Sequence, residues 1–112
     1  MVNVFPNGFA VDAKCVRDVV DRVIKQHGVT GNYEVNVNFV TEQEMSRLHD
    51  KKPHEVLSFP LIDPSTGSGR FAAGPDGITR LGDIVVLGKL PPQKRDLWIA
   101  HACLHLLGIH HE

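Results

Sequence analysis

The sequence is poor in cysteine and in long apolar runs. Its 112 residues include two cysteines, Cys15 and Cys103, which form no CxxC pair. Two cysteines are too few for a disulfide framework, so we expect both to be small buried hydrophobic residues in a reducing compartment. No apolar run approaches the roughly 20 residues that cross a bilayer, and the N-terminal segment lacks the basic and apolar regions of a secretory signal. We therefore expect a cytoplasmic protein without membrane contact.

The sequence also lacks an excess of either charge. It has 12 Lys and Arg residues against 13 Asp and Glu residues, a formal net charge of −1. This balance gives no overall attraction for nucleic acid, so an RNA partner would need a local basic patch. The hydrophobic fraction of 42% and the charged fraction of 22% are ordinary for a globular chain. At this length one hydrophobic core suffices, which predicts a single domain over residues 1–112.

Hydrophobic periodicity predicts an amphipathic helix and a strand in the first half of the chain. Valine and isoleucine recur at helical spacing over residues 16–24, with Asp12 as the N-cap and Gly28 just beyond the helix end. Polar and apolar residues then alternate over residues 33–39, which predicts a half-buried strand.

The remaining elements are expected to be short. Thr41 and Glu44 have the spacing of a capping box that opens a short helix. The same patterns predict a weak edge strand at 1–5, strands at 56–59 and 81–87, and a helix at 93–107. The Gly- and Pro-rich loop between the last two strands is long for a compact domain, and such loops are usually functional or mobile.

The histidines near the C-terminus have the spacing of metal ligands. His101 and His105 lie four residues apart on the predicted helix, which places both imidazoles on one face. Gly108 can end that helix in a left-handed conformation, and His111 is then free to supply a third ligand. The pattern H-x3-H-x2-G-x2-H suits three neutral nitrogen ligands with a fourth position open to water. It therefore predicts a catalytic metal ion.

Several alternatives to a zinc hydrolase stay open. Zinc is the first expectation for the ion, and nickel or copper also suit an all-imidazole site. The histidines could instead be ordinary surface or core residues, or a tag, although interleaved leucines argue against a tag. Metzincin proteases share the spacing but place a glutamate general base after the first histidine, and this chain has Ala102 there. A peptidase is therefore the minority alternative.

Three motifs, in order along the chain, resemble the YbeY family of single-metal endoribonucleases. HACLHLLGIHH at 101–111 resembles the family signature H-G-x-L-H-L-x-G-Y-D-H. HEVLSFP at 54–60 is similar to T-D-V-L-S-F-P, and LGDIVV at 81–86 is similar to L-G-D-I-V-I. The predicted first helix and the strand at 33–39 also fall where that family has them.

The resemblance implies a fold, a cofactor and a substrate. It implies an α+β domain in which a small mixed sheet of about four strands packs with helices, with a zincin-like metal helix near the C-terminus. It implies that His101, His105 and His111 bind one divalent metal ion, with zinc expected. It further implies cleavage of single-stranded RNA in ribosomal RNA maturation and ribosome quality control, with the ribosome or ribosomal proteins as partners. It gives no indication of the oligomeric state.

The chain departs from the family pattern in ways that affect the expected activity. His110 stands where the signature has aspartate, and it could be an alternative ligand, a proton shuttle or an exposed side chain; adjacent residues rarely both face one ion, which favours His111. The family's upstream arginine has no clear match. Lys51 and Lys52 cannot reproduce its bidentate contact with phosphate, so RNA cleavage is expected to be weakened or altered. The chain ends one residue after His111, and a minimal or truncated member would have a less protected metal site.

Two further residues are candidates for catalysis. Asp83 is expected to orient a ligand imidazole or the substrate, and the alternative is a strand-end carboxylate in a turn. Ser58 is expected to contact substrate, and the alternative is a buried hydroxyl bonded to backbone. Trp98 and Phe71 could stack on a base, with Trp98 more typical of core packing. Five basic residues could bind the RNA backbone, although each one singly is more typical of a solvated charge: Arg70, Arg80, Lys89, Lys94 and Arg95. The alternatives to a ribonuclease are another metallohydrolase and a non-catalytic metal-binding module on the ribosome.

Overall fold

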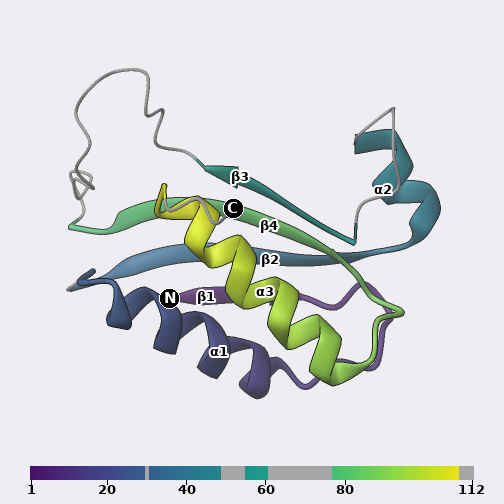
Figure 1. Ribbon diagram of the computed structural model, residues 1–112, viewed down its shortest axis with the longest axis horizontal. Helices are drawn as coiled ribbons and strands as arrows, with labels where there is room; N and C mark the ends of the chain where they lie inside the picture. The colour runs from purple at the N-terminus through teal and green to yellow at the C-terminus, as the bar shows by residue number, and fades with distance from the viewer. Residues whose placement is uncertain (30, 49–54, 61–76, 109–112) are drawn as a thin grey trace.

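The computed structural model describes residues 1–29, 31–48, 55–60 and 77–108. Within these ranges the chain forms four strands and three helices (Figure 1). In chain order they are β1 (Val2–Phe5), α1 (Ala13–Gln26), β2 (Tyr33–Val40), α2 (Glu42–Leu48), β3 (Val56–Pro60), β4 (Thr79–Leu87) and α3 (Pro92–Leu106). None of these helices combines the length and the apolar character needed to cross a membrane.

The strands form one mixed sheet in the order β1-β2-β4-β3. β1, β2 and β4 are parallel, and β3 runs antiparallel to β4 at the edge. The helices α1 and α3 lie side by side against one face of this sheet (Figure 1). The α+β class and the mixed four-stranded sheet are therefore confirmed.

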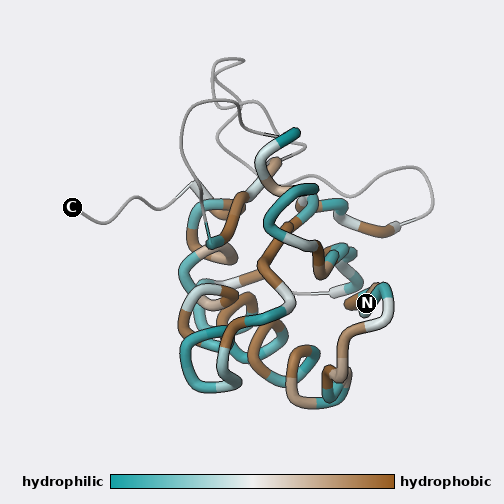
Figure 2. The backbone as a smooth tube through the Cα atoms, turned by 90° about the vertical axis from the view of Figure 1, so that its right-hand side faces the viewer, coloured by the Kyte–Doolittle hydropathy of each residue, from teal (hydrophilic) through white to brown (hydrophobic). Residues whose placement is uncertain are grey.

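The hydrophobic core fills the space between the sheet and the helices α1 and α3. In β2 the residues Val35, Val37 and Phe39 are fully buried, and the polar residues between them are half-buried on the other face. Val16 and Val20 of α1 are fully buried as well. Figure 2 shows polar and apolar residues alternating around the helices, as expected for helices that bury one face.

The predicted helix ends are confirmed. Asp12 caps α1 by accepting a hydrogen bond from the backbone N–H of Lys14 at 3.0 Å. Gly28 follows the helix with a φ of 84°, a left-handed conformation that suits glycine. The capping box at α2 is reciprocal: Glu44 accepts from the Thr41 N–H at 3.2 Å, and the Glu44 N–H donates to the Thr41 hydroxyl at 3.1 Å.

One cysteine prediction is wrong. Cys103 is fully buried in α3, and burial raises the pKa of its thiol to about 12. Cys15 is exposed instead. It lies next to the buried stripe of α1 rather than within it, and its thiol donates to Asp12 Oδ2 at 3.2 Å.

Candidate functional site

The terminal helix α3 carries the two histidines that begin the signature. Pro92 starts the helix, where its fixed φ and missing N–H are tolerated. The helix ends at Leu106, and Gly108 follows with a φ of 79° while its N–H donates to the His105 carbonyl at 3.0 Å. The expected left-handed glycine at the helix end is therefore confirmed.

His101 and His105 converge on one point. Their Nε2 atoms lie 2.8 Å apart, and their ring centroids lie 4.5 Å apart with planes at 71°. Both side chains are half-buried, so solvent and substrate can reach them. Two nitrogens bound to one tetrahedral zinc ion at the usual bond length lie about 3.3 Å apart. Opening the pair by about half an ångström would admit such an ion, so these residues fit a divalent metal.

The third expected ligand cannot be placed beside this pair. His111 and its neighbour His110 lie outside the described residues. Within the ranges that the structure does describe, no three His, Cys, Asp or Glu side chains form a group able to hold a metal ion. The ligand set of three histidines and the zincin-like character of α3 thus stay predictions.

The opposite side of α3 faces the core. Ala102, the residue directly after the first histidine, is 1% exposed. A metzincin protease needs its glutamate at this place. In this chain the position carries a methyl group and is covered by core residues, so it offers no general base to a substrate.

Trp98 lies one helical turn before His101. The ring centroids of Trp98 and His101 are 5.7 Å apart, and their planes are almost perpendicular, at 83°. The indole is half-buried and packs against the core, as expected. The contact with His101 was missed in the sequence, although residues three apart on a helix are neighbours.

Ser58 lies on the helix-covered side of the sheet. It pairs with the fully buried Ile84 across the β3–β4 ladder, and directly opposite residues of an antiparallel pair share a face. The side chain is half-buried rather than buried, and in the described part of the chain its hydroxyl has no hydrogen-bond partner. Ser58 is thus on the same side of the sheet as the histidine pair, with a hydroxyl available to a ligand.

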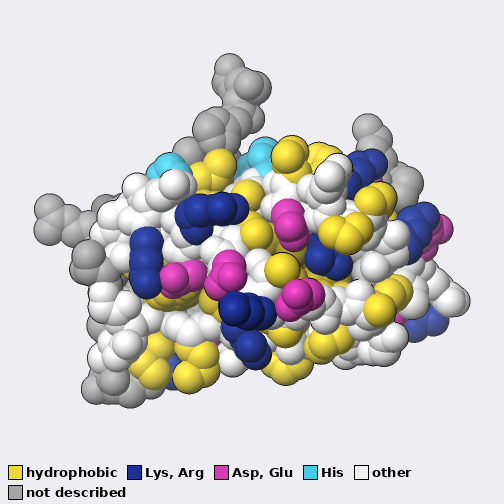
Figure 3. Space-filling view, turned by 90° about the horizontal axis from the view of Figure 1, so that it is seen from below, with side chains coloured by type: hydrophobic (Ala, Val, Ile, Leu, Met, Phe, Trp, Pro, Cys, Tyr) yellow, Lys and Arg dark blue, Asp and Glu magenta, His cyan; other side chains and the backbone are white. Residues whose placement is uncertain are grey.

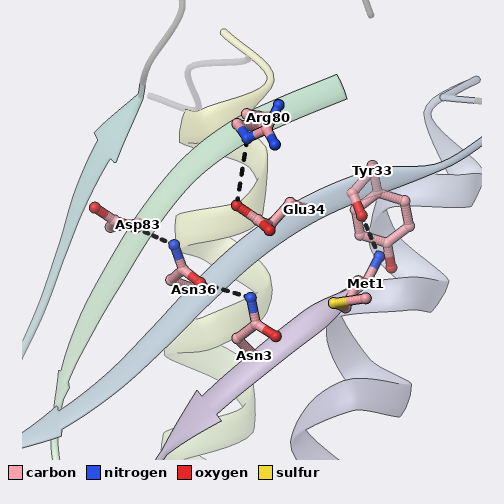
Figure 4. Close-up of polar contacts among 7 residues, drawn as sticks. All are labelled: Met1, Asn3, Tyr33, Glu34, Asn36, Arg80 and Asp83. Carbon is pink, nitrogen blue, oxygen red and sulfur yellow. Dashed lines mark hydrogen bonds and ion pairs between the residues drawn. The ribbon is translucent and has the colours of Figure 1, made fainter. Parts of the chain in front are cut away.

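Asp83 lies on the other side of the sheet. It pairs with Asn36, whose neighbours Val35 and Val37 point into the core. The amide of Asn36 donates to Asp83 Oδ1 at 2.8 Å, and the amide of Asn3 donates to Asn36 Oδ1 at 2.9 Å. Figure 4 shows this row of three side chains crossing the strands on the face away from α3. The structure therefore does not bring Asp83 together with the histidine pair.

Among the residues that the structure describes, the basic side chains that could bind RNA do not form one patch. Lys94 pairs with Glu55 at 2.9 Å, and Lys89 pairs with Glu42. These four residues line a cavity of about 440 Å³ at the N-terminal end of α3, where their charges balance. Figure 3 shows acidic and basic side chains interspersed on the face that α1 presents, with no continuous positive area.

The prediction that Arg95 is available to RNA is wrong. Arg95 is 5% exposed, and its guanidinium lies 6.0 Å from the centroid of the Phe39 ring. Its Nε lies 3.8 Å from Asp96 Oδ1. The side chain extends inward because it begins on the buried stripe of α3. Of the other predicted basic residues, Arg80 pairs with Glu34 at 3.7 Å (Figure 4), and Arg70 lies outside the described residues, as does Phe71.

Comparison with known proteins places this fold and these histidines in one family. The family model described as Endoribonuclease YbeY matches residues 9–112. A protein named Endoribonuclease YbeY from Thermoanaerobacter sp. is 33% identical over 91% of this chain and 79% of its own length. One of the same name from Corynebacterium diphtheriae is 30% identical over 94% of this chain, which spans 62% of that relative's length. Another, from Chloroflexus aurantiacus, is 29% identical over 94% of this chain and 77% of its own length.

The family match covers the part of the chain in which the two histidines lie. The family match includes the helix that carries His101 and His105, and the structure turns their Nε2 atoms toward one another. The chain belongs to the YbeY endoribonuclease family.

Proposed function

We propose that this chain is a metal-dependent endoribonuclease that cleaves single-stranded RNA in ribosomal RNA maturation and ribosome quality control. The convergence of the two Nε2 atoms within 2.8 Å supports the metal site. The names of the relatives, Endoribonuclease YbeY, support the reaction class. The ribosome or its proteins are the partners that this proposal implies.

In this proposal His101, His105 and His111 hold one divalent ion, with zinc expected. When bound, the ion would supply charge that stabilises the scissile phosphate in the transition state. It would also lower the pKa of a water molecule, which could then lose a proton and attack near neutral pH. The protein contributes the arrangement of the imidazoles. α3 fixes the spacing of His101 and His105, and Gly108 follows the helix in a left-handed conformation.

Ser58 and Asp83 have different places in the proposal. Ser58 faces α3 and offers its hydroxyl to the substrate backbone as a hydrogen-bond donor. The carboxylate of Asp83 accepts from Asn36 on the far face, so a substrate at the histidines would be separated from it by the sheet. We assign Asp83 to the polar row of the sheet, and a direct catalytic role is the alternative.

Metal analysis combined with RNA cleavage tests the proposal. The full chain is purified as wild type, as His105→Ala and as His27→Ala, which makes the same change at the exposed end of α1. We expect about one divalent ion per wild-type chain, and cleavage of a single-stranded oligoribonucleotide that a chelator abolishes and added metal restores. We expect His105→Ala to bind no metal. Its cleavage rate should fall at least about 100-fold, because an essential ligand is removed.

The control separates this site from other sources of activity. His27→Ala should keep the metal content and cleavage of the wild type. Equal metal content and equal cleavage in His105→Ala would contradict the proposal, and chelator-resistant cleavage would indicate a contaminating nuclease rather than this chain.

A further inference from the structure

Three rings follow one another along the same side of α3. Trp98, His101 and His105 are spaced by three and then four residues, which places them on one helix face. Each ring meets the next at a steep angle, 83° between the first two and 71° between the second two. His101 is therefore in contact with an aromatic ring on both sides.

The indole of Trp98 packs against the hydrophobic core, and this packing restricts the rotation of its ring. His101 is half-buried, and its orientation depends on what borders it. A rotation of His101 would break the perpendicular contact with Trp98 and would turn Nε2 away from His105 at the same time.

We infer that Trp98 is a positioning residue for the metal site: its ring holds the His101 imidazole so that Nε2 faces the point shared with His105. The inference rests on the proposed function insofar as that point holds a divalent ion. Metal-binding histidines are usually oriented by a hydrogen bond that their second ring N–H donates to a neighbouring carboxylate, carbonyl or water. Here an aromatic contact serves the same purpose, since perpendicular ring pairs are favoured at centroid distances of 4.5–7 Å and this pair lies at 5.7 Å.

Core packing alone is the competing explanation, and two apolar replacements separate it from positioning. Trp98→Phe keeps an aromatic edge toward His101, and Trp98→Leu keeps apolar bulk without a ring. Packing alone predicts the same metal affinity for both variants. Positioning predicts that phenylalanine preserves the affinity and leucine does not. Leu97→Ala is the matched control, because its side chain is on the same helix and is 73% exposed.

The decisive measurement is the Zn²⁺ dissociation constant of the full chain, obtained by competition with a chromogenic chelator. We expect Trp98→Leu to weaken Zn²⁺ binding about 10-fold, at the low end of the effect of removing an orienting partner. Trp98→Phe should stay within about 3-fold of the wild type, and Leu97→Ala should be unchanged. Circular dichroism establishes that each variant keeps its helices, and if Trp98→Leu does not fold, Trp98→Met replaces it as the non-aromatic variant.

The outcomes distinguish this inference from the proposed function. If the wild type binds Zn²⁺ and Trp98→Leu binds it with equal affinity, the positioning role is overturned and the metal site stands. Wild-type chain without Zn²⁺ affinity would overturn both. Trp98 is the single tryptophan of the sequence, so its emission provides a second readout. Co²⁺ bound beside His101 should quench it in the wild type and not in His105→Ala, and unquenched emission at full Co²⁺ loading would overturn the inference.

Discussion

The two faces of the sheet carry different kinds of side chain, although the same strands supply both. On the face that α1 and α3 cover, β2 contributes Val35, Val37 and Phe39, all fully buried. On the other face the same strand contributes Asn36, which links Asn3 to Asp83 through its amide. Alternation along one strand thus separates an apolar interior from a polar row.

The candidate site belongs to the helix-covered face. The histidine pair lies on α3, and Ser58 points to the same side from the edge strand β3. α3 can hold the pair in place because its other side is anchored in the core through Ile99, Ala102 and Cys103. The difference between the faces suggests that substitutions on the covered side affect folding and metal binding, and that substitutions on the far side affect neither strongly.

The same substitution on the two faces gives the largest expected contrast. Phe39→Ala removes a fully buried ring, and we expect it to lower the free energy of unfolding by about 3–5 kcal/mol. Phe59 pairs with Asp83, so its side chain lies on the far face, where it is 42% exposed. Phe59→Ala should lower the free energy of unfolding by less than about 1 kcal/mol. Urea denaturation followed by circular dichroism measures both, and equal effects would contradict the separation of the faces.

Much of the fold could be predicted from the sequence, because hydrophobic periodicity and helix-capping residues are local signals. Every expected helix and strand is present, and the ends that the structure describes agree within one or two residues. The strand expected at 56–59 extends one residue further, to Pro60. Proline is tolerated there because an edge strand has N–H groups that need no partner strand.

The side chains of β4 were harder to assign to a face. The run LGDIVVL does not alternate between polar and apolar residues, so its pattern gives no orientation for Asp83. The register with β2 also shifts between Glu34 and Val35, where β4 accommodates an extra residue. A shift by one residue moves every following side chain to the other face. The spacing of His101 and His105, by contrast, is set within one helix and needed no tertiary information.

A polar contact on the covered side should give a smaller, pH-dependent effect. The Tyr33 hydroxyl donates to Asp21 Oδ1 at 2.7 Å and thereby joins β2 to α1. This hydrogen bond, and then Lys25, hold the pKa of the Asp21 carboxyl below its ordinary 3.8. Because the folded pKa is the lower one, the contribution to stability is present above the unfolded pKa and is lost as pH falls through the folded pKa.

Tyr33→Phe should therefore lower the free energy of unfolding by about 1 kcal/mol at pH 7, a modest value because the Asp21 side chain is 42% exposed. The difference between wild type and variant should shrink at acid pH, below the ordinary pKa of the carboxyl. Urea denaturation at a series of pH values measures it. A difference that stays constant down to the most acidic pH would show that the hydroxyl acts without the charge of Asp21.

The smallest effect is expected on the far face, at Asp83. Asparagine at this position still offers a side-chain oxygen to the Asn36 amide, so Asp83→Asn should change the free energy of unfolding by less than about 1 kcal/mol. RNA cleavage should stay within about 2-fold of the wild type. Ser58→Ala, on the covered side, should reduce cleavage about 5-fold through loss of one hydrogen bond to substrate. If Asp83→Asn instead lost more than about 10-fold in cleavage at unchanged metal content, the charge of Asp83 would act in the reaction, and function would not be confined to one face of the sheet.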